Sequence, residues 1–234
     1  MDLQTLNTPA ALIDVGRMHR NIARMQTHLD ALGVTFRPHV KTTKCGHVVD
    51  AQIAAGAQGI TVSTLKEAGQ FFAGGVRDIV YAVGMVPAKL GQALALRRQG
   101  CDLKIVADSL QAAHAIAAFG REQGERFDVW IEVDVDGHRS GIPPEAGLLI
   151  DVGRALVDGG MVLGGVLAHA GSSYEYDTPD ALAAIAEQER SRTVRAAERL
   201  RAAGLPCPVV SIGSTPTALS AQHLDGVTEV RAGV

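Results

Sequence analysis

The sequence lacks a long apolar run and a secretory leader, and these absences exclude two classes of protein. No apolar run approaches the roughly 18 residues that a membrane-spanning helix needs. The start, MDLQTLNTPAALID, has no basic region followed by an apolar stretch of secretory length. We therefore expect a cytoplasmic protein that does not bind a membrane.

The sequence also lacks an excess of charge of either sign and a framework of cysteines. Lys and Arg number 22 against 25 Asp and Glu, so the net charge of −3 gives no general reason to bind nucleic acid. The three cysteines, Cys45, Cys101 and Cys207, are odd in number and far apart. This spacing indicates neither a disulfide framework nor a local zinc site, so we expect buried or free thiols and no metal site in this chain.

What the sequence does contain is an alternation of short β-branched runs with longer segments rich in Ala, Leu, Arg and Glu. With 234 residues and 47% apolar content, the chain can build a sizeable core. The alternation predicts parallel strands joined by helical crossovers. Strands are expected at 34–37, 59–62, 79–82, 103–107, 129–135, 163–169, 208–212 and 227–231, and helices at 16–32, 44–55, 64–73, 87–99, 109–124, 144–158 and 179–203. This pattern favours an α/β fold of the (β/α)8 barrel type over an open sheet.

Two segments do not fit a complete barrel. PAALID, residues 9–14, has a strand pattern before the first helix and no place in a ring of eight strands. At the other end, the sequence stops at EVRAGV, in or just after the eighth strand, without the helix that would close the ring. We therefore expect these residues to be the front part of a longer protein.

A basic cluster follows the first predicted strand, in RPHVKTTKCGH at 37–47. Active residues of such barrels lie at the carboxyl ends of strands and in the loops that follow. A lysine aimed into the barrel mouth is costly to desolvate as an ammonium, so burial should lower the pKa of Lys41 toward that of an imine-forming amine. Arg37, His39 and Lys44 should push the same way. Alternatively, Lys41 and Lys44 are exposed residues of an ordinary loop.

A second candidate site lies after the seventh and eighth predicted strands. SIGSTPT, at 211–217, places Gly213, Ser214 and Thr215 where backbone N–H groups can surround a phosphate, although it lacks the lysine of a nucleotide-binding loop. Gly233, in the RAG that follows strand eight, adds to it because these two loops commonly form the phosphate site of such barrels. The alternative is a set of ordinary turns, which use the same residue types.

Three further polar side chains are expected near the same mouth. Arg139, flanked by glycines, could donate to a ring nitrogen or an acid oxygen, or could pair internally with Asp134 or Asp136. His169 and Tyr174 follow the sixth strand, although a single histidine at a strand end is often structural. A lysine, a phosphate cradle and a donor for a ring nitrogen are together what pyridoxal phosphate requires.

These stretches resemble the pyridoxal-phosphate enzymes of alanine-racemase-like barrel fold that act on D-amino acids, especially the eukaryotic-type D-serine dehydratases and the D-threonine aldolases. The matching stretches span almost the whole chain in the order of that family. They are TPAALID (8–14), RPHVKTTK (37–44), STLKEA (63–68), IEVDVDGHRSG (131–141), HAGSSY (169–174), SIGSTPT (211–217) and EVRAG (229–233). One departure is Thr43, where many relatives have a histidine.

The resemblance implies a role for each candidate residue. Lys41 would form the internal aldimine and act as the base at the substrate Cα. The other cofactor-binding residues would be His39, Arg139, His169 and Tyr174 around the ring, and Gly213, Ser214, Thr215 and Gly233 at the phosphate. Whether Arg139 or Tyr174 reaches the pyridine nitrogen is left open.

The resemblance also implies a domain plan. Residues 1–15 would contribute a strand to a second, β-rich domain, and residues 16–234 would form the cofactor-binding barrel, cut off at strand eight. The β-rich domain of the family supplies ligands to a divalent metal, zinc or manganese, which would polarise the substrate β-hydroxyl. We expect that metal only if the second domain is present in the full protein.

The implied activity is a lyase reaction on a small β-hydroxy D-amino acid, carried out by a homodimer. We expect dehydration of the D-serine or D-threonine type, because HAGSSY and SIGSTPT look nearer to the dehydratases. Retro-aldol cleavage of D-threonine or 3-hydroxy-D-aspartate is the first alternative. A non-catalytic pyridoxal-phosphate carrier of the same barrel type is the second, and a barrel that binds a phosphorylated ligand without an imine is the third.

Overall fold

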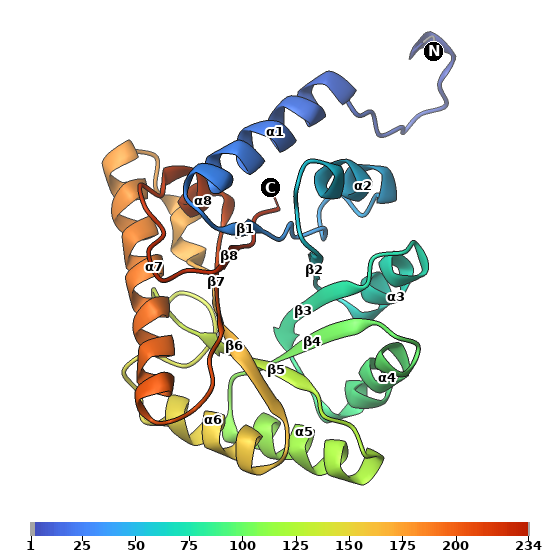
Figure 1. The fold of residues 1–234 in the computed structure, drawn as a ribbon. Coiled ribbons are helices and arrows are strands. Elements are labelled where there is room, and N and C mark those ends of the chain that lie inside the picture. Colours follow the sequence, from blue (N-terminus) through green and yellow to red (C-terminus); the bar gives the residue numbers. More distant parts are fainter. Residues whose placement is uncertain (1–2, 234) are drawn as a thin grey trace.

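The computed structural model describes residues 3–233 and shows a ring of parallel strands surrounded by helices (Figure 1). The sheet has eight strands in the order β1-β8-β7-β6-β5-β4-β3-β2. The strands are β1 (Thr35–Phe36), β2 (Ile60–Val62), β3 (Asp78–Gly84), β4 (Asp102–Ala107), β5 (Asp128–Val133), β6 (Val162–Ala168), β7 (Val209–Ile212) and β8 (Glu229–Val230).

The ring closes between β1 and β2 just beyond the short β1 strand. His39 forms a parallel bridge with Thr61, and the backbone N–H of Gln58 donates to the carbonyl of Phe36 at 2.8 Å. The N–H of Thr61 donates to the carbonyl of Pro38 at the same distance, 2.8 Å. The predicted α/β fold with a (β/α)8 barrel is therefore confirmed.

The helices follow the predicted crossovers, with one addition. They are α1 (Val15–Ala31), α2 (Gly46–Ala54), α3 (Leu65–Ala73), α4 (Pro87–Arg98), α5 (Leu110–Gln123), α6 (Leu148–Asp158), α7 (Pro179–Ala202) and α8 (Thr215–Ser220), with 3-10 turns η1 (Leu3–Thr5) and η2 (Gly171–Glu175). The addition is α8, whose N-cap Ser214 accepts from the Thr217 N–H and whose first turn contains Pro216. None of the helices within residues 3–233 is long and apolar enough to cross a lipid bilayer.

The expected strand at 9–14 is not present among the described residues. The segment runs away from the barrel beyond α1 (Figure 1), and Leu12 and Ile13 are 61% and 56% exposed. A strand needs partners for its backbone N–H and C=O groups, and the closed ring offers it no edge. The division into 1–15 and 16–234 stays a prediction, and residues 1, 2 and 234 of it lie outside the described part.

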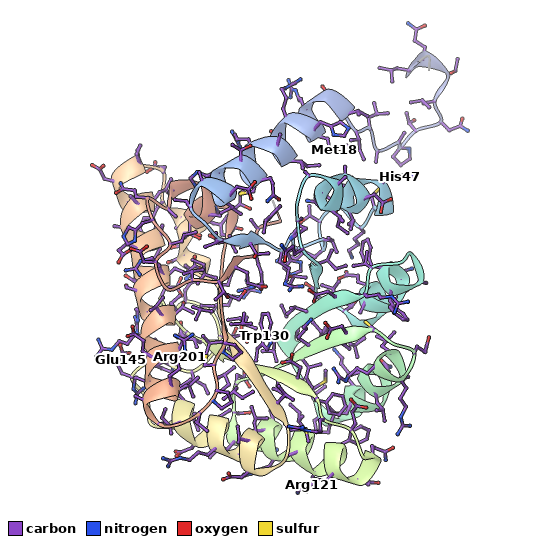
Figure 2. All side chains as sticks on the ribbon, in the orientation of Figure 1. Met18, His47, Arg121, Trp130, Glu145 and Arg201 are labelled. Atoms are coloured by element: carbon purple, nitrogen blue, oxygen red, sulfur yellow. The ribbon has the colours of Figure 1, made fainter. Side chains whose placement is uncertain are left out.

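Strand alternation divides the apolar residues into two cores. Side chains on the outward face pack beneath the helices in one large cluster that includes Ile79, Ile105 and Ile131. The inward face carries a small cluster of Val80, Val106, Trp130 and Leu167. Figure 2 shows Trp130 in the middle of the ring of strands, while the labelled residues of the outer helices lie at the periphery. The cysteines are free thiols, as predicted, and Cys101 and Cys207 are buried.

Beside this small apolar cluster, the barrel interior holds charged side chains. Arg37 is 6% exposed, and its Nε donates to Glu229 Oε2 at 2.8 Å while its Nη1 donates to Asp78 Oδ1 at 2.8 Å. Glu229 belongs to β8, the neighbour of β1, and Asp78 begins β3. Arg37 is therefore neutralised inside the barrel, and the expectation that it acts on Lys41 is wrong.

Replacing Arg37 by methionine should lower the free energy of unfolding by roughly 3–5 kcal/mol, because it leaves the buried Glu229 carboxylate without its partner. Urea unfolding of the purified protein measures this. Arg17→Met is the control, since Arg17 and Asp14 form an exposed pair with side chains 78% and 61% accessible, and it should change stability by less than about 0.5 kcal/mol. Equal effects of the two substitutions would contradict the role of Arg37. Adding Glu229→Gln to Arg37→Met should restore part of the lost free energy of unfolding, because it removes the unpaired buried charge.

Candidate active site

The candidate residues come from the carboxyl ends of neighbouring strands. Lys41 follows β1, Gly233 follows β8, Gly213 follows β7 and His169 follows β6. These four strands are consecutive in the sheet. With about 4.8 Å between adjacent strands, the strand that carries Lys41 lies about 10 Å from the strand that leads to Gly213.

Lys41 is partly buried at the rim of the barrel. Burial lowers the pKa of its amine below the ordinary value of a lysine, and the nearby guanidinium groups of Arg139 and Arg231 lower it further, while Glu67 acts in the opposite direction. Lys44, by contrast, is an exposed side chain whose Nζ pairs with Glu67 Oε1 at 3.1 Å. The expected effect on Lys41 is therefore present, but its cationic sources are Arg139 and Arg231. The expectation that Arg37, His39 and Lys44 supply it is wrong, and His39 is itself neutral because burial lowers its pKa to about 3.

Two neutral imidazoles accompany Lys41. Burial, with the charges of Lys41 and Arg231, lowers the pKa of His39 to about 3. Burial lowers the pKa of His169 to about 4, against the hydrogen bond that joins its Nδ1 to the carbonyl of Gly213 at 2.7 Å. Because a carbonyl only accepts, Nδ1 of His169 carries the proton, and its Nε2 is left as a bare acceptor.

The turn after β7 is fixed by hydrogen bonds and by close backbone contacts. Ser214 is 1% exposed; its Oγ accepts from the Thr217 N–H at 3.3 Å and lies 2.7 Å from Ser173 Oγ. Gly213 has φ +137°, and a Cβ there would collide with the carbonyl of Arg231. A Cβ on Gly233 would collide in the same way with the carbonyl of His39. Both glycines are thus required by packing, independently of any ligand.

A cavity of about 230 Å³ lies beside this turn, between α1, α2 and α8. Two of the residues predicted to bind phosphate, Thr215 and Gly233, line it, together with Thr43. The Ser214 hydroxyl, by contrast, is enclosed in the cap of α8. Among the four residues predicted to bind phosphate, Thr215 and Gly233 are therefore the two that face this cavity.

Arg139 and Tyr174 are exposed at the mouth. In the part of the chain that the structure describes, Arg139 forms no ion pair, so the alternative of internal pairing with Asp134 or Asp136 is not found. Those carboxylates instead accept backbone hydrogen bonds, Asp134 from Gly137 at 2.8 Å. The Tyr174 ring lies 6.1 Å from the His169 ring, between centroids.

Two buried charged groups lie next to the site, and the sequence prediction gave neither of them a role. Arg231 is 4% exposed; its Nε donates to Ser211 Oγ at 2.8 Å and its Nη2 donates to the carbonyl of Ala168. Its inward direction follows from strand alternation, since it lies two residues after the inward Glu229. Glu189 lies within α7 and is fully buried. No motif marks a glutamate in the middle of a long helix, so no sequence signal pointed to it.

No group of three or more His, Cys, Asp or Glu side chains lies close enough together to hold a metal ion within residues 3–233. The expected metal would therefore need ligands from other residues, and its presence stays a prediction.

Comparison with known proteins identifies the family. The alanine racemase N-terminal domain family matches residues 13–234. This chain belongs to that family. It is 70% identical, over 99% of its length, to D-threo-3-hydroxyaspartate dehydratase of Delftia sp. (strain HT23), whose solved structure has a TM-score of 0.98 to this barrel over 98% of the chain. The predicted resemblance is confirmed.

Two further relatives carry the names from which the resemblance was drawn. They are a D-serine dehydratase of Dictyostelium discoideum, 29% identical over 99% of the chain, and a D-threonine aldolase of Arthrobacter sp, 30% identical over 99%. The chain spans 61%, 63% and 61% of the lengths of these three curated relatives.

The lowered pKa of His169 predicts a loss of stability in acid. His169 takes up a proton near pH 6.5 in the unfolded chain but only near pH 4 in the folded chain. The contribution of neutral His169 to the free energy of unfolding is therefore complete above pH 6.5 and is lost as the pH falls toward 4. Asn can donate to the Gly213 carbonyl without titrating. The free energy of unfolding falls between pH 7 and pH 4, and this fall should be about 2 to 3 kcal/mol smaller in His169→Asn than in the wild type. Urea unfolding at the two pH values measures the difference.

His114→Asn, on the exposed face of α5, is the matched control and should keep the acid slope of the wild type. The same slope in His169→Asn would contradict a neutral, buried His169.

Proposed function

We propose that this chain is the pyridoxal-phosphate-binding barrel of a lyase that dehydrates a small β-hydroxy D-amino acid. The observation that carries the proposal is the Lys41 amine, partly buried beside two guanidinium groups that lower its pKa, two strands away from the turn at 213–215. The 70% identity to D-threo-3-hydroxyaspartate dehydratase supports dehydration and suggests 3-hydroxy-D-aspartate as the substrate class.

The residues fit the cofactor that the family uses. An amine with a depressed pKa suits an aldehyde, because only the neutral amine attacks a carbonyl carbon. Arg139 and Arg231 give the mouth a positive potential, which favours an anionic ligand with a phosphate and a carboxylate. Thr215 and Gly233, which line the adjacent cavity, are placed to meet the phosphate end.

Pyridoxal phosphate, when bound, accepts the electron pair released at the substrate Cα. Lys41 would hold the aldehyde carbon through Nζ and then take the Cα proton. Arg139, exposed at the mouth, would bind the carboxylate or the ring nitrogen. His169 offers its bare Nε2 as a hydrogen-bond acceptor, and its low pKa keeps it neutral in the working range of most enzymes. His39 and Tyr174 would pack around the ring.

Substituting Lys41 by alanine should abolish the visible absorption band of the protein incubated with pyridoxal phosphate and lower turnover by about 10²- to 10⁴-fold, because the residue is both attachment point and base. Borohydride reduction of the wild type should fix the cofactor to Lys41, as peptide mass spectrometry can show. Lys44→Ala is the control, since this exposed lysine is three residues away and pairs with Glu67. Cofactor attached to Lys44, or to neither lysine, would refute the proposal.

Retro-aldol cleavage is the second candidate, because the Arthrobacter relative is named an aldolase. The two reactions differ in products: dehydration releases a keto acid and ammonia, and cleavage releases glycine and an aldehyde. We expect keto acid and ammonia from D-threo-3-hydroxyaspartate and from D-serine. Glycine as the main product would favour the aldolase, and bound cofactor without turnover would favour a carrier.

We further propose that the active protein is a cytoplasmic homodimer, that residues 1–15 pack on a second domain, and that zinc or manganese is bound by ligands outside the described residues. These parts come from the family resemblance. Light scattering of the purified protein tests the dimer, and metal analysis of the active preparation tests the ion.

A further inference from the structure

Glu189 is a fully buried carboxylate in the third turn of α7. The helix packs there against β6 and β7, so the carboxylate lies behind the ends of the two strands that lead to His169 and Gly213. A buried carboxylate is costly unless donors surround it, and this one is fully supplied. Two of its donors are backbone N–H groups of the loops after β6 and β7, and the third is a hydroxyl of α8.

One oxygen of Glu189 connects the two loops. Its Oε1 accepts the backbone N–H of Ala170 at 2.7 Å and that of Gly213 at 3.3 Å. Ala170 directly follows His169, and Gly213 is the residue whose carbonyl accepts the proton of His169 Nδ1 at 2.7 Å. The same oxygen therefore holds both the backbone next to the imidazole and the residue to which the imidazole is bound.

The second oxygen fixes the helix that follows. Glu189 Oε2 accepts from the hydroxyl of Thr217 at 2.6 Å, and Thr217 in turn completes the capping box of α8 with Ser214. On the other side of His169, Arg231 donates to the carbonyl of Ala168. The backbone on both sides of His169 is thus held by hydrogen bonds to buried polar side chains, Arg231 on one side and Glu189 on the other.

We propose that Glu189 is a positioning residue that fixes the orientation and the Nδ1–H tautomer of His169, so that the imidazole presents a bare Nε2 to the barrel mouth. The use of that nitrogen toward the cofactor or substrate rests on the proposed function. Without the hydrogen bonds from these two N–H groups to Glu189, the backbone at Ala170 and the backbone at Gly213 can move apart. Nδ1 of His169 then loses the Gly213 carbonyl as its acceptor. A neutral imidazole free of that constraint populates both tautomers.

The test is ¹⁵N NMR of histidine-labelled, cofactor-free protein, with the His169 signals assigned from their loss in His169→Asn. The wild type should show one protonated and one bare ring nitrogen. Glu189→Met should move the two ¹⁵N shifts toward each other as the tautomers mix. Glu189→Gln, whose amide oxygen can keep both N–H bonds, should restore the pattern of the wild type.

Thr217→Val is the matched control. It removes a buried hydrogen bond from the same carboxylate but leaves the bonds to Ala170 and Gly213, so it should keep the single tautomer. If Glu189→Met does not fold by circular dichroism, Glu189→Asp decides, because a side chain one methylene shorter cannot hold both N–H groups and should give mixed tautomers.

Mixed tautomers in Glu189→Met or Glu189→Asp, with one tautomer in Thr217→Val and Glu189→Gln, support the proposal. A single tautomer in Glu189→Met overturns the proposal; if that variant does not fold, a single tautomer in Glu189→Asp does so. Mixed tautomers in Thr217→Val or in Glu189→Gln also overturn it. The measurement needs no cofactor, so its result is independent of the absorbance and product tests of the proposed lyase.

Discussion

A chain of hydrogen bonds through the inside of the barrel links most of the strands on which the site is built. It runs from Asp78 on β3 to Arg37, Glu229, Ser211 and Arg231, and ends on the carbonyl of Ala168 on β6. Apart from Asp78, whose side chain is 37% accessible, each side chain in it is a buried polar group that is satisfied by its neighbour. The chain therefore joins β1, β8, β7 and β6 from inside the barrel, in addition to their backbone pairing.

The polar interior has a functional consequence. A barrel core of well-packed apolar side chains is often as stable as one with buried ion pairs, so stability alone does not explain these charges. Arg231 brings a buried positive charge close to Lys41, His39 and His169, where it favours the neutral form of each. Burial is the larger cause of the three lowered pKa values, and the network that links the strands adds to it through Arg231.

The mouth combines rigid backbone with exposed side chains. Gly213 and Gly233 allow the ends of β7, β8 and β1 to approach closely, and Glu189 holds the loops after β6 and β7 from behind. Arg139 and Tyr174, in contrast, remain exposed. A site with a fixed floor and adaptable exposed groups suits a cofactor that must be held in place while its substrates exchange.

The sequence by itself determined the alternation of strands and helices, and with it the barrel and the set of strand ends that carry Lys41, His169 and Gly213, because these depend on local periodicity and on turn residues. Only the tertiary structure decided which charges act on Lys41. Arg37 is near in sequence but faces inward to Glu229, whereas Arg231 is distant in sequence and adjacent in the ring. Glu189 was hidden for the same reason, because its partners come from loops that only the closed barrel brings to one helix.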